Sequence, residues 1–265
     1  MSVRVQCNDG GHRLEIVAFE PMLSSSSKLA LILIALGLAS CSRDLERAQV
    51  AYTPSGARLH WSSKEIVLTP APERMGEQPF ALISPALIAA ASSWNRALAG
   101  CKAPRFLVNR TVLSGPLVGD DRVNAIIVHE RKWCPTTSVQ REDCYPADLQ
   151  AHTLLYPNIQ PGSPKDGELR GIDIEVNAVD YRWSVRESKD SLSLQTIFMH
   201  ELGHVLGLDH PCGPNTEWSN KKRPLVACDP SAPLRIMRSD IASVTRGDSV
   251  APSQGEIDTV CELYH

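Results

Sequence analysis

Hydrophobic residues follow two different periods along this chain, and the changes of period outline its secondary structure. Five short segments are rich in Val, Ile and Leu and are bounded by Pro, Gly or polar residues, so they predict β-strands. These segments span residues 64–69, 105–109, 124–129, 151–156 and 171–177. Pro70 and Pro72 follow the first segment and are expected to end it.

Apolar residues at helical spacing predict a first long helix after the first strand. Ser84 and Pro85 are expected to open it as N-cap and first-turn proline, and Gly100 is expected to end it. The residues predicted to form its buried face are Leu87, Ala91, Trp94 and Leu98.

Two further helices are predicted in the second half of the chain. One runs from about residue 191 to residue 206, where Gly207 stops it. Its buried stripe comprises Leu194, Phe198, Leu202 and Val205. Ser253 and Glu256 form a capping-box pattern that opens the last helix. The inner face of that helix comprises Ile257, Val260, Cys261 and Tyr264. The order of strand, helix, four strands, helix, irregular stretch and helix predicts an α+β domain.

An apolar run near the N-terminus predicts an export signal. Residues 29–39 (LALILIALGLA) follow Lys28 and are too few for a helix that spans a bilayer, which needs roughly 20 residues. The run leads into Leu38-Ala39-Ser40-Cys41, which resembles the bacterial lipobox, where the cysteine is lipidated and becomes the mature N-terminus. A buried apolar helix beside an incidental cysteine is the alternative interpretation.

This pattern divides the chain into three parts. Residues 1–40 are the predicted signal region, with Met22 as an alternative start, residues 41–60 a polar tether, and residues 61–265 the folded domain. Ser42 does not resemble the aspartate that retains lipoproteins at the inner membrane. We therefore expect an exported outer-membrane lipoprotein on the periplasmic or cell-surface side, held by a lipid on Cys41, with the leaflet left open.

Cysteine usage agrees with export. Of the eight cysteines, setting aside Cys7 and Cys41 leaves an even number, which predicts disulfides in an exported chain. These are Cys101, Cys134, Cys144, Cys212, Cys228 and Cys261. Six cysteines allow fifteen pairings. The local pairs Cys134–Cys144 and Cys212–Cys228 would each close a Pro- and polar-rich loop and leave Cys101 for Cys261. A structural metal cluster is the competing interpretation, although no C-x-x-C pair occurs.

Composition and charge narrow the class of partner. The chain is 43% hydrophobic and 22% charged, as is ordinary for a soluble globular protein, and its net charge is -3. No basic stripe is visible, which weighs against nucleic acid. We expect a monomer that has no nucleic-acid partner.

The run HELGHVLGLDH, which begins at His200, carries the candidate chemistry. His200 and His204 are four residues apart on a predicted helix, so both imidazoles project from one face and can bind one Zn²⁺. Gly207 permits the turn that brings His210 back as a third ligand. Three histidines leave one zinc position open for water, as in catalytic sites. Glu201 can lie beside the metal without ligating it. A helix that carries solvated histidines is the alternative.

The extended motif HExxHxxGxxH is that of the metzincin metalloproteases, and HELGHVLGLDH resembles the matrixin branch most closely. Residues 151–153 resemble the family's substrate-binding edge strand, residues 171–177 with Trp183 resemble its fifth strand, and residues 253–264 resemble its closing helix. The resemblance covers about residues 60–265. It implies a metzincin-like catalytic domain with a twisted, mostly parallel five-stranded sheet, an active-site helix and a C-terminal helix, with a cleft between two parts.

The resemblance also implies roles for individual residues. One catalytic Zn²⁺ would be held by His200, His204 and His210, and Glu201 would act as general base and acid toward the zinc-bound water. A methionine turn would lie beneath the metal, and Met237 is the candidate for it. The implied function is endopeptidase cleavage of protein or peptide substrates that lie extended against the edge strand.

Some residues depart from the family pattern. Arg238-Ser239-Asp240 follows the candidate methionine, where matrixins have the Pro-x-Tyr that shapes their specificity pocket, so the pocket preference stays open. Glu175 stands where the fifth strand of the family carries a structural-zinc histidine, and a lone His152 is more often just a strand residue. We therefore predict no second zinc. Binding of Ca²⁺ is left open, and no residue pattern supports it. No cysteine-switch prodomain fits between Cys41 and the first strand.

Two other functions are compatible with these residues. One is a zinc hydrolase that acts on a non-peptide amide, and a free edge strand would favour peptide over it. The other is a non-catalytic surface binding or adhesion protein on the same fold, which the intact Glu201 and zinc ligands disfavour. The remaining histidines are expected to be surface or structural residues, namely His12, His60, His129 and His265.

Overall fold

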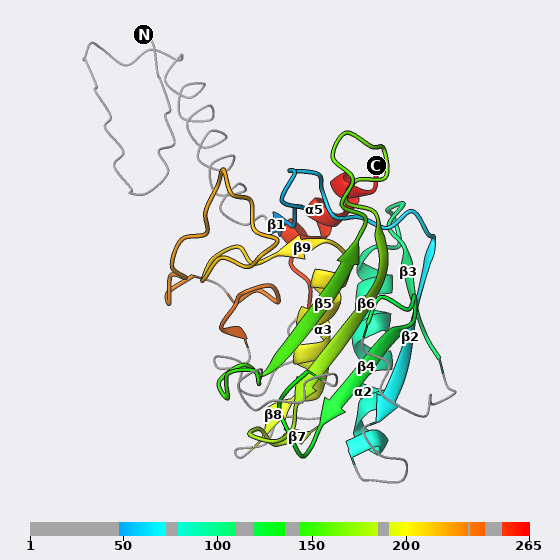
Figure 1. Cartoon of the computed structure of the whole chain (residues 1–265). Coiled ribbons are helices and arrows are strands. Elements are labelled where there is room, and N and C mark those ends of the chain that lie inside the picture. Colours follow the sequence, from blue (N-terminus) through cyan, green and yellow to red (C-terminus); the bar gives the residue numbers. More distant parts are fainter. Residues whose placement is uncertain are drawn as a thin grey trace, which may run out of the picture. The chain divides into compact units, whose positions relative to one another are not determined.

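In the part of the chain that the computed structural model describes, most of the strands and helix α2 precede helix α3, and a short strand, irregular segments and helix α5 follow it (Figure 1). This part comprises residues 48–72, 79–109, 119–135, 144–184, 191–232, 234–241 and 251–265. The predicted signal region and Cys41 lie outside it. Among the described residues, no helix has the length and apolar character that a membrane crossing requires.

Five strands form one sheet in the order β3–β2–β4–β6–β5. Their bounds are Glu65–Pro72 for β2, Arg105–Val108 for β3, Asn124–His129 for β4, Ala151–Pro157 for β5 and Leu169–Asn177 for β6. Neighbouring strands are parallel except at one end of the sheet, where β5 joins β6 antiparallel. The predicted α+β class and mostly parallel five-stranded sheet are therefore confirmed.

The first strand is longer than predicted, because two prolines do not end it. β2 continues through Pro70 to Pro72. Leu68 accepts a hydrogen bond from Asn109 just beyond the end of β3, so the even-numbered residues of β2 turn their main-chain groups toward β3. β3 has already ended beside Pro70 and Pro72, so neither proline removes a ladder hydrogen bond there.

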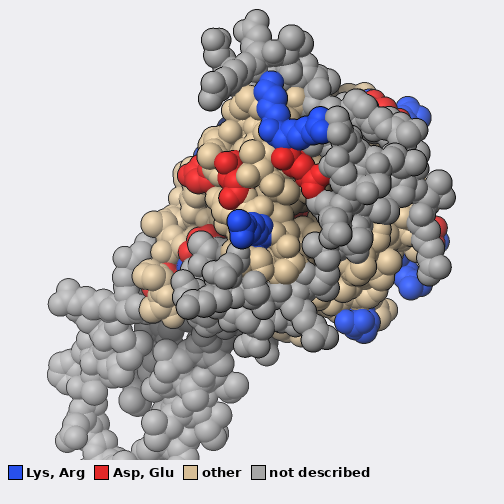
Figure 2. All heavy atoms as spheres, turned by 90° about the horizontal axis from the view of Figure 1, so that it is seen from below, with Lys and Arg blue, Asp and Glu red and all other residues tan. Residues whose placement is uncertain are grey.

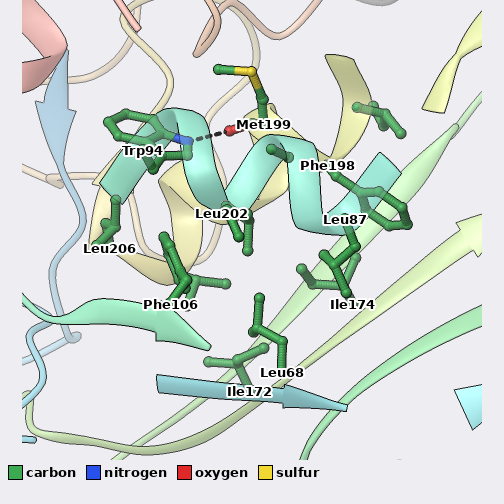
Figure 3. Close-up of a cluster of buried hydrophobic side chains, with 14 of the residues drawn as sticks. Leu68, Leu87, Trp94, Phe106, Ile172, Ile174, Phe198, Met199, Leu202 and Leu206 are labelled. Carbon is green, nitrogen blue, oxygen red and sulfur yellow. Dashed lines mark hydrogen bonds between the residues drawn. The ribbon is translucent and has the colours of Figure 1, made fainter. Parts of the chain in front are cut away.

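Two long helices, α2 (Pro79–Ala97) and α3 (Leu194–Val205), pack against each other and against one face of the sheet (Figure 1). All the apolar residues predicted for their inner faces are buried. Figure 3 shows the centre of this core, where Trp94 of α2 donates its indole N–H to the carbonyl of Met199 in α3 at 2.8 Å. A buried tryptophan is stabilising when its N–H is satisfied in this way.

Helix α2 also begins earlier than predicted. It starts at Pro79, and Pro85 lies inside it instead of in its first turn. The interior proline removes one helical hydrogen bond, which is unfavourable. Ile83 lies one turn before Leu87 and is 1% exposed, so packing of the extra turn offsets the loss.

The last helix begins where the capping box predicts. α5 (Gln254–Leu263) has Ser253 as N-cap, and both reciprocal hydrogen bonds between Ser253 and Glu256 are present. Two short strand pairs complete the described structure. β1 (Gln49–Val50) pairs antiparallel with β9 (Leu208–Asp209), and β7 (Trp183–Ser184) pairs with β8 (Leu192–Ser193).

Residues 48–60 differ from the expected tether, because they are packed into the folded unit that starts at Ala48. Leu59 is fully buried, and Ala51 donates its N–H to the carbonyl of Gly207 at 2.8 Å. The few apolar residues of this segment are spaced irregularly among polar ones, so their sequence pattern gives no sign of packing. Contacts with distant residues make the segment part of the domain, since it also bonds to Trp218, to Gly167 and to Thr259 of α5.

Among the described residues, three disulfides join Cys101 to Cys261, Cys134 to Cys144 and Cys212 to Cys228. These are the pairs that the sequence favoured. The first ties the end of α2 to α5, and the other two close local loops. On the face seen in Figure 2, the described Lys and Arg side chains lie among Asp and Glu side chains and form no single basic patch.

Candidate metal centre

Three histidine rings converge at the C-terminal end of α3. His200 and His204 project from the helix one turn apart, and His210 follows directly after β9. Their Nε2 atoms are 3.2 Å apart in each of the three pairs. Among the described residues, these side chains are the one group of His, Cys, Asp or Glu arranged to hold a metal ion.

This triangle fits a tetrahedral zinc ion. A regular tetrahedron with edges of 3.2 Å has its centre about 2.0 Å from each corner, which is the usual zinc–nitrogen distance in proteins. Three neutral imidazoles are also a typical ligand set for catalytic zinc. The residues present therefore fit the metal on both geometry and donor chemistry.

The second ring nitrogens show how the histidines are held. Nδ1 of His200 lies 2.6 Å from the carbonyl oxygen of Ile236, and Nδ1 of His204 lies 2.9 Å from that of Leu208. Such bonds fix the ring orientation and leave Nε2 as the ligand atom. Nδ1 of His210 is buried and has no hydrogen-bond partner among the described residues.

Burial keeps these rings in the form that binds metal. Burial, and secondly the nearby His204, lower the pKa of His200 to about 4. Burial is also the main cause that lowers the pKa of His210. Both imidazoles are therefore neutral near pH 7, and a neutral imidazole is the metal ligand.

The comparison with known families agrees with this geometry. The family model for matrixin matches residues 138–219, which include β5, β6, α3 and all three histidines. No match was found among curated proteins. The three-histidine cluster and the matrixin match point to the same class of enzyme. This chain is a matrixin-like zinc metalloendopeptidase.

Glu201 is the acidic residue of the metalloendopeptidase motif, and the structure buries it to 3% exposure. It lies on α3 between His200 and His204 and is not part of the ligand triangle. One of its carboxylate oxygens accepts a hydrogen bond of 2.5 Å from the hydroxyl of Thr153 on β5. The active-site helix and the edge strand are thus connected at the candidate base.

Met237, the candidate for the methionine turn, packs directly against the ligand helix at Gly203. A Cβ atom added to Gly203 would come within 2.1 Å of the Met237 sulfur, so the glycine makes the close approach possible. Glu256 of α5 accepts a hydrogen bond from the Met237 N–H at 2.9 Å. The capping box of α5 therefore supports the turn, and Ile236 in the same turn orients His200.

The turn that returns His210 to the site depends on Gly207. Its φ of 89° is left-handed, and an added Cβ would lie 2.5 Å from the Leu59 carbonyl oxygen. The buried Asp209 then accepts hydrogen bonds from the His210 N–H at 2.8 Å and from the Ser219 hydroxyl at 2.6 Å. These contacts join the loop closed by Cys212–Cys228 to the third ligand.

Glu175 on β6 and His152 on β5 both lie beside the Tyr145 ring. Glu175 accepts hydrogen bonds from the Tyr145 hydroxyl at 2.5 Å and pairs with His129 at 3.0 Å. His129 is buried and structural, and it lies edge-on to Trp133. His152 packs against the Tyr145 ring, and its Nδ1 has no partner among the described residues. The carboxylate of Glu175 is thus bound to two side chains of the protein itself.

Arg238 follows the methionine where matrixins have a different residue pattern. Its guanidinium forms two hydrogen bonds of 2.8 Å with Asp240 and one of 2.9 Å with the Asp229 carbonyl. Beside this guanidinium, the pKa of Asp240 is lowered. Arg238 therefore connects the loop that follows Cys228 to the segment that contains Met237.

Sequence reasoning missed Thr153, Asp209 and Glu256 as residues of the site. Thr153 is a polar residue at a core-facing position of its strand, between the apolar Ala151 and Leu155, and that position was a usable signal. Glu256 was predicted only as part of the capping box of α5. Its additional contact, with Met237, leaves no pattern in the neighbouring sequence. That contact joins residues 19 apart in sequence.

Proposed function

We propose that this metalloendopeptidase cleaves protein or peptide substrates with Glu201 as its general base and acid. The observation that carries the proposal is the placement of Glu201 on α3. Its carboxylate is buried, adjacent in sequence to a ligand of the three-histidine site, and hydrogen-bonded by Thr153. A carboxylate fixed beside a metal site without ligating it suits proton transfer.

The mechanism assigns separate tasks to the residues of the site. His200, His204 and His210 would hold zinc, and the metal would supply Lewis-acid polarisation of the scissile carbonyl and of the attacking water. Glu201 accepts a proton from that water as it attacks the carbonyl. Glu201 then delivers the proton to the leaving amine, so that the carboxylate is regenerated after each turnover.

The substrate would lie extended along β5. In the described sheet, β5 has one neighbour, β6, so its other edge is open to an added strand. Main-chain hydrogen bonds to such an edge recognise an extended peptide regardless of its side chains. A free edge beside the candidate base favours a peptide over another amide as substrate.

Removal and return of the metal tests this function. The purified mature chain should cleave an unstructured protein such as casein, lose that activity when a chelator removes zinc, and regain it when zinc is added. The expected loss is at least about a hundredfold, because the Lewis acid contributes several kcal/mol of transition-state stabilisation. Cleavage products and metal content would be measured in parallel.

A matched preparation treated with chelator and zinc together controls for damage by the chelator. Full cleavage by the zinc-free protein would contradict a zinc-dependent mechanism. If the zinc-loaded protein cleaves nothing in a broad peptide library, the fold serves binding and not peptide hydrolysis.

We further propose that a lipid on Cys41 anchors the chain to the bacterial outer membrane. The support is the sequence alone, in which the apolar run 29–39 leads into Leu38-Ala39-Ser40-Cys41. Cys41→Ser should move the protein from the membrane fraction to the soluble fraction, because a lost acyl anchor removes most of the membrane affinity. Cell fractionation with an antibody against the folded domain measures this.

Cys7→Ser, a cysteine outside the lipobox pattern, is the control and should fractionate as the unchanged protein does. If Cys41→Ser stays in the membrane fraction at the same level, the anchor lies elsewhere.

A further inference from the structure

Thr153 occupies an unusual position on the edge strand. Residues Ala151, Thr153 and Leu155 alternate along β5 and form its buried face, each 8% exposed. Thr153 is the polar one of the three. A polar side chain at a buried strand position is stable when it forms a hydrogen bond, and here the bond goes to Glu201 of α3.

The hydrogen bond from Thr153 fixes the carboxylate of Glu201. The Thr153 hydroxyl donates to Oε2 of Glu201 at 2.5 Å. Among the described residues, no other hydrogen bond reaches this carboxylate. A glutamate side chain has three rotatable bonds, so a single strong contact to one oxygen decides where the other oxygen points.

The main chain of Thr153 faces the open edge of the sheet. Asn177 donates its N–H to the Gln150 carbonyl, and bonded pairs alternate along antiparallel strands. Gln150, His152 and Leu154 therefore turn their main-chain groups toward β6. Thr153 turns its own N–H and C=O away from β6, where an added strand would bind.

We propose that Thr153 is a positioning residue, and that it couples substrate binding to the orientation of the general base. Its hydroxyl holds Oε2 of Glu201 so that Oε1 is directed at the attacking water. Its main-chain N–H and C=O bind the extended peptide at the same residue. The inference rests on the proposed role of Glu201 and adds a residue that the zinc motif does not contain.

Substitution of Thr153 separates its side chain from its main chain. Thr153→Val removes the hydroxyl and keeps the branched shape, so the main-chain contacts and the KM for a peptide should change by less than about twofold. The kcat should fall by about tenfold to a hundredfold, which corresponds to a hydrogen bond to a charged group. Thr153→Ser keeps a hydroxyl and should restore kcat to within about threefold of wild type. Zinc content should be unchanged in both.

Thr196→Val is the matched control. Thr196 is a buried threonine of α3 whose hydroxyl has no partner among the described residues, so its loss should leave kcat unchanged. The double variant Glu201→Gln/Thr153→Val should be no slower than Glu201→Gln alone, because the hydroxyl acts through the carboxylate.

The outcomes distinguish this inference from the proposed function. If Glu201→Gln is inactive while Thr153→Val keeps the kcat of wild type, Thr153 is not a positioning residue and the base assignment stands. If Glu201→Gln cleaves as wild type does, the proposed function itself fails. Should Thr153→Val not fold, Thr153→Ala is compared with Thr153→Ser, and equal kcat values for these two would overturn the inference.

Discussion

Glu201→Gln is expected to bind zinc like the unchanged enzyme but to cleave at least about a hundredfold more slowly. The amide matches the carboxylate in size, and Glu201 is not one of the ligands, so metal content and folding should change little. A glutamine cannot accept the proton of the attacking water. General-base assistance is worth about 10²–10⁴-fold in rate, or about 3–5 kcal/mol of the barrier.

The measurement is kcat on a peptide substrate, together with zinc content and the thermal unfolding midpoint. Glu65→Gln makes the same chemical change on β2 at an exposed glutamate and should leave kcat as it was. Equal rates for Glu201→Gln and the unchanged enzyme would exclude Glu201 as the base. A loss of zinc in Glu201→Gln would instead mean that the carboxylate contributes to metal binding.

His204→Ala should lose both zinc and cleavage. His204 supplies one corner of the 3.2 Å triangle and lies between the other two ligands in sequence. With two histidines left, the site lacks the three protein ligands of catalytic zinc, and the Leu208 carbonyl loses the ring that it orients. Activity should fall to background, and a dialysed sample should hold far less than one zinc per chain.

His60→Ala provides the comparison for this variant. His60 is outside the ligand triangle, and its Nδ1 contacts the Arg58 carbonyl, so zinc content and kcat should be retained. Stoichiometric zinc in His204→Ala after dialysis would contradict the ligand assignment. Glu201→Gln and His204→Ala together separate loss of the base from loss of the metal.

The histidine spacing and the capping residues are examples of what local sequence can predict. His200 and His204 meet because a helix repeats every 3.6 residues, and this period is the same in any helix. Ser253 and Glu256 form a capping box for the same reason, since both partners lie within one turn. The disulfide pairs within the two loops are also short-range, and their cysteines are 10 and 16 residues apart.

The end of β2 and the start of α2 were predicted less well, because contacts with elements distant in sequence decide them. Pro70 and Pro72 remain in β2 since β3 ends beside them, and no feature of residues 65–72 shows where a strand 40 residues later will stop. Pro85 is tolerated inside α2 because Ile83 gains a buried position in the preceding turn. In both cases a neighbouring part of the structure, and not the local preference of proline, decides where the element begins or ends.

The sequence by itself therefore determined that the strands of the five-stranded sheet and the long helices form, because these depend on short repeats. It also determined the ligand triangle, which depends on helical spacing and on a glycine turn at Gly207. Only the tertiary structure decided which distant groups support that triangle. Thr153 reaches Glu201 across 48 residues of sequence, and Glu256 reaches the Met237 turn from another helix. Residues 48–60 join the domain through main-chain hydrogen bonds to distant residues, among them Gly207 and Trp218. These contacts form between elements whose relative positions are set by burial of the whole core, and no local pattern encodes them.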